Sequence, residues 1–141
     1  MTAVRVRKKS PWFLSLFQRL NAVPDTAGFV LRTIEYAYRI QKAPYDEALV
    51  RFEYVSRDAE PEFDYCRNHV QFHADFHGVI RNFSPSKLHI PTGWVTIESV
   101  IRFLFTDLKV EPLRHNWKKI LADSERLFRE WTGRTVPDSE A

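Results

Sequence analysis

The sequence predicts an α+β fold, in which a small antiparallel sheet of four to five strands carries an N-terminal helix and two C-terminal helices packed on one face. Three observations predict it. Residues 28–91 repeatedly alternate apolar and polar side chains, as strands do. After Trp94 the apolar residues instead recur every three or four positions, as in helices. The 141 residues are 44% hydrophobic, which is enough for one domain with a core.

We expect this single domain to span residues 1–133, with a basic arm at its N-terminus (residues 1–10) and a flexible tail at residues 134–141. No acidic residue precedes Asp25, so the arm is a candidate contact for a nucleic acid or an acidic protein partner. The alternative is a solvated tail without a partner. The cations of the arm are Arg5, Arg7, Lys8 and Lys9.

The first predicted element is a short helix over residues 11–21. Ser10 is a suitable helix cap, and Pro11 suits the first helical position. Five apolar side chains recur at helical spacing and would be buried against the sheet or against a second subunit. A turn at residues 24–28 ends this element. The five apolar residues are Trp12, Phe13, Leu16, Phe17 and Leu20.

Residues 28–41 and 48–58 are the first two predicted strands, joined by a turn at residues 44–46. In the second of them, Arg51 and Glu53 lie on the face opposite to the apolar side chains, because successive strand residues point to opposite faces. A polar, proline-containing loop follows. The segments that complete the sheet are 69–77, 79–83 and 87–91.

Two helices are predicted after the sheet. Thr96 caps the first, whose apolar residues recur at three- and four-residue steps as far as Leu108. Pro112 separates it from the second helix. The apolar stripe of the second helix runs from Trp117 to Trp131, and the glycine at position 133 ends it.

Composition limits the classes of function. The single cysteine, Cys66, excludes an internal disulfide framework and a cysteine-rich zinc site. No apolar run reaches the length of a signal peptide or a membrane span. We therefore expect a soluble cytoplasmic protein that makes no membrane contact and carries no cofactor.

The segment HVQFHADFHG, residues 69–78, holds three of the five histidines. On a helix, His69 and His73 would be one turn apart and could share a metal ion. On a strand, the polar and apolar side chains separate cleanly onto two faces, and this alternation favours the strand. His69 and His73 would then lie about 13 Å apart along the chain. Zinc holds each imidazole nitrogen at about 2 Å, so these two histidines could not share one ion.

A hairpin over residues 78–88 would bring His89 near Asp75 and His77 and create one polar patch with the neighbouring strand. Imidazoles exchange protons near neutral pH, arginines bind phosphate, and Asp75 or Glu53 could fix an imidazole tautomer. The patch therefore predicts metal-independent cleavage or binding of RNA, and the alternative is a solvated sheet face. The candidate catalytic residues are His73, His77, His89, Glu53 and Asp75, and the candidate phosphate ligands are Arg51 and Arg81.

Three stretches carry a resemblance to a known family: RFEY, HVQFHADFHG and HIPTGWVTIESVIRFLF. Over about residues 30–108 the chain resembles the TumE-like family of small bacterial toxin–antitoxin proteins. The resemblance implies a small α+β toxin with nuclease activity, encoded beside a DNA-binding antitoxin. The chain departs from the family's arginine–tyrosine–aspartate pattern, because Phe52 and Glu53 replace the tyrosine and the aspartate. The positions to which the resemblance assigns the site are Arg51, His73, His77 and His89.

Three functions therefore stay open. The first is a small effector of toxin–antitoxin or defence type that acts on RNA and binds an antitoxin or another protein. The second is a non-enzymatic regulatory subunit that binds a partner, or a second copy of the chain, through its aromatic helices and basic N-terminus. The third is a metal-dependent hydrolase centred on His77 and His89.

Overall fold

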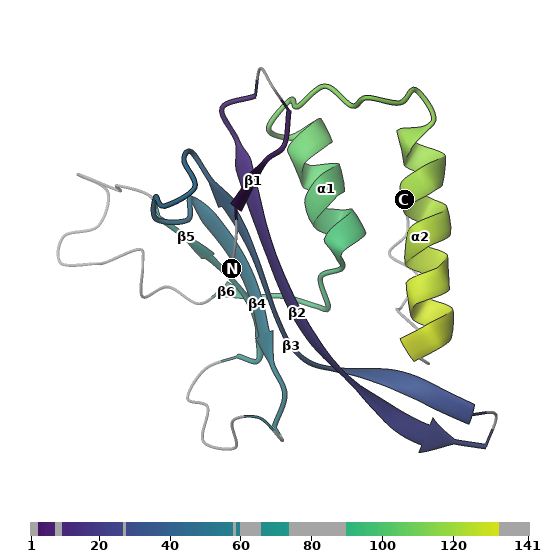
Figure 1. Ribbon diagram of the computed structural model, residues 1–141. Helices are drawn as coiled ribbons and strands as arrows, with labels where there is room; N and C mark the ends of the chain where they lie inside the picture. Colours follow the sequence, from purple (N-terminus) through teal and green to yellow (C-terminus); the bar gives the residue numbers. More distant parts are fainter. Residues whose placement is uncertain are drawn as a thin grey trace, which may run out of the picture. The chain divides into compact units, whose positions relative to one another are not determined.

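The computed structural model describes residues 3–7, 10–26, 28–57, 59, 66–73 and 90–132. They contain a six-stranded sheet and two helices, so the fold is α+β (Figure 1). The predicted number of strands, four to five, was thus too low, because the described residues already contain six. The elements are β1 (Ala3–Arg5), β2 (Phe13–Asp25), β3 (Gly28–Gln41), β4 (Val50–Val55), β5 (Asn68–Phe72), β6 (Ile90–Pro91), α1 (Ile97–Thr106) and α2 (Trp117–Thr132).

The strands follow one another in the sheet in chain order, from β1 to β6. Strand β4 pairs antiparallel with β3 on one side and with β5 on the other, as an antiparallel meander requires. The register places Arg39 of β3 opposite Arg51 of β4, and Arg51 opposite Gln71 of β5. The same register places Glu53 of β4 opposite His69 of β5.

The prediction of an N-terminal helix was wrong, because the segment lies in strand β2. Strand β2 and strand β3 form a long hairpin whose turn ends at Gly28, with a φ of 130° that favours glycine. Ser15 is buried, and its hydroxyl donates to the side-chain oxygen of Gln41 on β3 at 2.6 Å. Ser10 does bind the backbone, but its hydroxyl accepts from Trp12 N in a local turn. The aromatic residues of this segment are weak helix formers and good strand formers, so pairing with β3 prevails.

Strand β3 has the predicted bounds, and β4 lies within the predicted 48–58. Strand β5 includes residues 69–72 of the histidine segment, which confirms the strand interpretation for these four residues. Strand β6 occupies the end of the predicted segment 87–91. The predicted segment 79–83 and the predicted tail 134–141 lie outside the described residues.

One face of the strands β3, β4 and β5 is apolar and aromatic. Tyr36 and Tyr38 are almost fully buried, and their rings stack with centroids 4.6 Å apart. The ring of Tyr54 lies 5.7 Å from that of Tyr36. The buried aliphatic side chains Ile40, Val50 and Val70 complete this side. This burial fixes the strand register, because a slip of one residue would expose the whole apolar set.

The chain forms two compact units. The first consists of Met1–Arg19 and Ile34–Gly93, and the second of Leu20–Thr33 and Trp94–Ala141. Strands β1, β4, β5 and β6 belong to the first unit and the two helices to the second, whereas β2 and β3 contribute to both. The prediction of a single domain stays a prediction.

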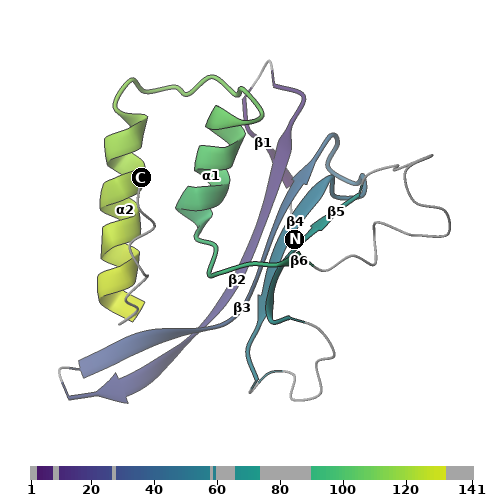
Figure 2. The same cartoon turned by 180° about the vertical axis from the view of Figure 1, so that it is seen from behind.

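The two helices lie side by side within the second unit, as both views show (Figures 1 and 2). The hydroxyl of Thr96 caps α1 by accepting from Ser99 N at 3.1 Å, as the sequence predicts. Val100, Leu104 and Leu121 are buried. The described part of the chain holds no helix long and apolar enough to cross a membrane.

Candidate functional site

The face of the sheet opposite to the stacked tyrosines carries a cluster of charged side chains. The pleat places Arg39 of β3, Arg51 and Glu53 of β4, and His69 of β5 on this face. We call these four residues the sheet cluster. They come from three adjacent strands, so the backbone hydrogen bonds of the sheet hold them together.

Glu53 is the centre of the sheet cluster. Its Oε1 accepts from Arg51 Nη2 at 2.5 Å and from Arg51 Nε at 3.2 Å. Nη2 of Arg39 lies 3.6 Å from the same oxygen. The guanidinium groups of Arg39 and Arg51 therefore share one carboxylate oxygen. The two arginines lie directly opposite each other on neighbouring strands. Like charges in that position repel, and the carboxylate between them offsets the repulsion.

His69 faces the other oxygen of Glu53, with Nε2 3.6 Å from Oε2. Its Nδ1 lies 2.9 Å from the carbonyl oxygen of Cys66 and therefore carries the hydrogen of that contact. The side chain is only 1% exposed. Both ring nitrogens face protein oxygens, so His69 holds the cluster in place and offers no nitrogen to a substrate.

Glu53 is ionised at neutral pH. Burial raises the pKa of its carboxyl group, but the His69 ring and the guanidinium groups of Arg51 and Arg39 outweigh burial and lower the pKa from 4.5 to about 2. The cluster thus has two permanent positive charges and one negative charge. Because the side chains of Arg39 and Arg51 are 38% and 36% exposed, the surplus positive charge is accessible to a ligand.

A second imidazole–carboxylate pair lies where β5 ends. Nδ1 of His73 is 3.2 Å from Oε1 of Glu47, and the two side chains are 55% and 63% exposed. The N–H of His73 donates to the carbonyl of Leu49 at 2.9 Å, so the β4–β5 register continues by one residue pair. His73, unlike His69, is open to solvent.

The structure brings together two of the predicted site residues, Arg51 and Glu53. It does not join His73 to Glu53, because His73 pairs with Glu47. Arg5 of the basic arm lies over the ring of Phe13, 4.9 Å from its centroid. Arg7 is described, but its predicted contact with a partner is untested. The other predicted site residues lie outside the described residues: Lys8, Lys9, Asp75, His77, Arg81 and His89.

Sequence reasoning missed two members of the sheet cluster, Arg39 and His69. The signal for them was the strand alternation itself, which places Arg39 on the face opposite to Tyr38 and His69 on the face opposite to Val70. Their partners depend on the register between strands. The apolar pattern excludes a slip of one residue, but it does not distinguish registers that differ by two residues, which depend on the turns between the strands.

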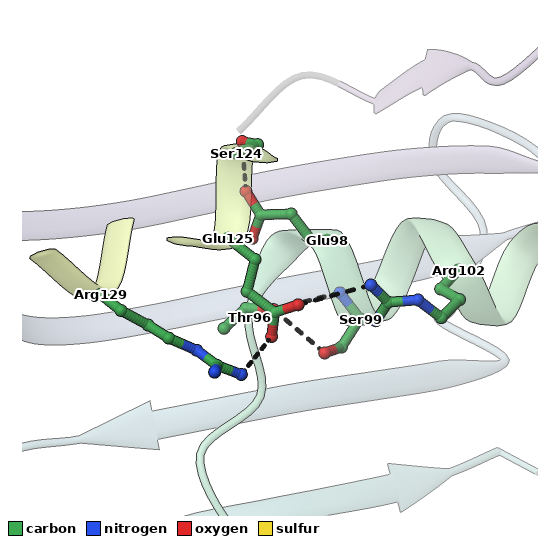
Figure 3. Close-up of polar contacts among 7 residues, drawn as sticks. All are labelled: Thr96, Glu98, Ser99, Arg102, Ser124, Glu125 and Arg129. Carbon is green, nitrogen blue, oxygen red and sulfur yellow. Dashed lines mark hydrogen bonds and ion pairs between the residues drawn. The ribbon is translucent and has the colours of Figure 1, made fainter. Parts of the chain in front are cut away.

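A second cluster of polar and charged side chains joins the two helices (Figure 3). Glu125 of α2 accepts from Arg129 at 3.1 Å and from Arg102 of α1 at 3.4 Å. The hydroxyl of Thr96 donates to the same carboxylate at 3.4 Å. We call Thr96, Arg102, Glu125 and Arg129 the helix cluster.

Next to the helix cluster, the hydroxyl of Ser124 donates to Oε1 of Glu98 at 2.6 Å. Glu98 is only 4% exposed, in the first turn of α1. The contact adds a further polar link between the two helices. A buried carboxylate needs such donors, because burial without them is costly.

Within the described ranges, no group of three or more His, Cys, Asp or Glu side chains is placed to hold a metal ion. The metal-dependent alternative depended on His77 and His89, which lie outside those ranges. Arg39 and Arg51 instead suit an anion, because guanidinium groups match the geometry of phosphate oxygens.

Comparison with known proteins assigns the chain to no family: no family model matches it, and no curated protein or solved structure is significantly similar to it. The resemblance to the TumE-like family therefore stays a prediction.

Proposed function

We propose that this chain binds RNA through its phosphodiester backbone on the face of β3, β4 and β5, and that it cleaves the bound RNA with its own side chains. One observation carries the proposal: Arg39 and Arg51 lie directly opposite each other and share the single carboxylate of Glu53. An RNA phosphate supplies the negative charge that balances the second guanidinium.

The cleavage part of the proposal uses the accessible imidazole of His73. Continuing the β4–β5 register places His73 on the same face as Gln71, which is paired with Arg51. A step of two residues along a strand is about 7 Å. An imidazole, the side chain that most often transfers protons in catalysis, thus lies one two-residue step along the chain from Gln71, the residue paired with Arg51.

The binding experiment measures the affinity for a fluorescently labelled single-stranded RNA between about 50 and about 200 mM salt. We expect the double variant Arg39→Gln/Arg51→Gln to bind about 10- to 100-fold more weakly. Each lost phosphate contact also makes the slope of log affinity against log salt shallower by about 0.7, so this variant should change the slope by about 1.4.

The matched control is Lys119→Gln/Arg126→Gln, which removes the same charge from two exposed ion pairs on α2. We expect this control to leave the affinity and the salt slope nearly unchanged. Equal losses in both double variants would show attraction by net charge alone and would contradict a site on the sheet.

In the cell, we propose that the chain acts as a small effector of toxin–antitoxin type, which a partner protein holds in check. Inducible expression of the parent should then arrest growth. His77→Ala or His89→Ala should relieve the arrest if these histidines, which lie outside the described residues, complete the site. A parent that does not affect growth would contradict the effector proposal and leave the RNA-binding measurement unaffected.

A second candidate function is protein binding through α2. Ile120, Leu127 and Trp131 are exposed at spacings of seven and four residues, so they form one apolar stripe on the helix. Such stripes commonly mark an interface. Self-association measured by sedimentation should therefore decrease in Trp131→Asp and persist in Ala122→Asp, an exposed position on another side of α2. A parent that stays monomeric at all concentrations would remove this candidate in its self-associating form.

A further inference from the structure

The pair formed by His73 and Glu47 differs from the sheet cluster in which ring nitrogen faces the carboxylate. The carboxylate of Glu47 contacts Nδ1 of His73, at 3.2 Å, whereas that of Glu53 faces Nε2 of His69. An ionised carboxylate only accepts hydrogen bonds, so its place beside Nδ1 favours the neutral tautomer that carries its hydrogen on Nδ1. Nε2 then has the lone pair. A histidine held in this way is prepared to take a proton at Nε2.

Accessibility separates this pair from His69 and Glu53. The ring of His69 is 1% exposed, and its two nitrogens face Cys66 O and Glu53 Oε2. The ring of His73 is 55% exposed, so a substrate can approach it. His69 lies on β5 and His73 directly follows β5. Of these two rings, only that of His73 both faces a carboxylate and is accessible to a substrate.

We propose that Glu47 is a positioning residue that holds His73 in the Nδ1–H tautomer, so that Nε2 serves as the general base for RNA cleavage. The inference rests on the proposed function, because it requires RNA bound at Arg39 and Arg51. It assigns a role to a carboxylate that the sequence analysis did not select. Because both side chains are largely exposed, the pair contributes little to the stability of the fold, and loss of Glu47 should leave the protein folded.

The reaction balances without an external reagent. The ribose 2′-hydroxyl gives its proton to Nε2 of His73, and the 2′-oxygen forms a bond to phosphorus while the bond from phosphorus to the 5′-oxygen breaks. The leaving 5′-oxygen takes a proton from solvent water, and the resulting hydroxide removes the proton from the imidazolium. The products are a 2′,3′-cyclic phosphate and a 5′-hydroxyl. The substrate class is RNA, because DNA lacks the 2′-hydroxyl.

The first experiment reads the tautomer directly and needs no RNA. In protein labelled with nitrogen-15 at histidine, NMR spectra of the neutral ring should show the Nδ1–H tautomer for His73 in the parent. Glu47→Ala should shift His73 toward the tautomer mixture of an unrestrained histidine. Glu47→Gln should restore the parent tautomer, because its amide oxygen can accept a hydrogen bond from Nδ1. The matched control is Glu130→Ala, which removes an exposed carboxylate from α2 and should change nothing.

The second experiment follows cleavage of the same single-stranded RNA. We expect Glu47→Ala to lower kcat by about 10- to 100-fold with little change in KM, because the residue acts through the base and does not bind phosphate. His73→Gln should lower kcat at least as far. An RNA with a single 2′-deoxy substitution should stay intact at that position.

The outcomes separate the two proposals. A Glu47→Ala protein that keeps the Nδ1–H tautomer, or that cleaves RNA at the parent rate, overturns the role of Glu47 and leaves RNA cleavage standing. A parent that neither binds nor cleaves RNA overturns the proposed function, and this reaction with it. A tautomer shift in Glu47→Ala, restored in Glu47→Gln and accompanied by the loss of kcat, supports the inference.

Discussion

Two carboxylates of this protein each lie between two arginines, one on the sheet and one between the helices. Their exposure is nearly the same, at 17% for Glu53 and 15% for Glu125. Their third partners differ, because Glu53 also faces the buried ring of His69 and Glu125 also faces the hydroxyl of Thr96. The flanking arginines are Arg39 and Arg51 on the sheet, and Arg102 and Arg129 on the helices.

The difference lies in what else holds the flanking elements together. Strands β3, β4 and β5 are joined by backbone hydrogen bonds, which need no particular side chains. Helices α1 and α2 have no such ladder between them, so their packing against each other depends on side chains. The arginines of the helix cluster therefore stabilise the packing of the helices. Strand pairing does not depend on the arginines of the sheet cluster, and we propose that they bind RNA instead.

The largest effect on stability is expected for Glu53→Gln. This change leaves two guanidinium groups opposite each other and the buried ring of His69 facing a neutral amide. We expect a loss of about 2 to 3 kcal/mol in the free energy of unfolding, measured with urea. The comparison variant Glu125→Gln should lose about 1 kcal/mol, because its third partner is a neutral hydroxyl. Equal losses would contradict a special role for His69.

The RNA affinity of the same variant sharpens the comparison. Removing the carboxylate raises the net charge of the proposed phosphate site by one, so folded Glu53→Gln should bind RNA at least as tightly as the parent. Glu125→Gln should not change the affinity. If folded Glu53→Gln lost RNA affinity, the carboxylate itself would be part of the binding surface, and the proposed role of the arginines would have to change.

The lowered pKa of Glu53 predicts how the free energy of unfolding changes at acidic pH. The folded-state pKa is about 2 and the ordinary value is 4.5, so the carboxylate stabilises the fold above pH 4.5 and loses this effect as the pH falls toward 2. After allowance for the partial exposure of the arginines, the effect is on the order of 2 kcal/mol. The difference in unfolding free energy between the parent and Glu53→Gln should therefore shrink across this range. A constant difference would contradict the lowered pKa.

The sequence predicted most of the elements, because their apolar periods are clear. Strand β3 has the predicted bounds, and Thr96 caps α1 as predicted. The N-terminal helix was wrong because residues 11–21 place aromatic side chains at spacings that also fit a helix. A hairpin partner was available immediately after the turn at Gly28, and pairing with it prevailed over the local pattern.

The candidate site was predictable only in part, for a related reason. Alternation along β4 correctly placed Arg51 and Glu53 on one face. The partners Arg39 and His69 come from the neighbouring strands β3 and β5, so their place beside Glu53 depends on the register between strands. No residue pattern within a strand shows which residue of the next strand lies opposite.

The link between Ser124 and Glu98 makes a smaller prediction. Ser124→Ala removes the hydroxyl that donates to the buried carboxylate at 2.6 Å, and we expect a loss of about 1 to 2 kcal/mol. Ser124→Thr keeps a hydroxyl and should lose less. Thermal unfolding followed by circular dichroism measures both. If Ser124→Ala had the stability of the parent, the link would not contribute to the packing of the helices.

The smallest effects provide the clearest test of the comparison between the two clusters. Arg102→Gln removes a side chain that connects α1 to α2, so it should lower the free energy of unfolding by about 1 kcal/mol. Arg39→Gln removes a side chain from strands that the backbone ladder already joins, and its loss of unfolding free energy should stay below about 0.5 kcal/mol.

The RNA affinity should show the reverse order, with a decrease in Arg39→Gln and none in Arg102→Gln. Because the two arginines have nearly equal exposure, at 38% and 40%, solvent screening does not explain such a reversal. The same order in both measurements would mean that the two clusters do not differ in function.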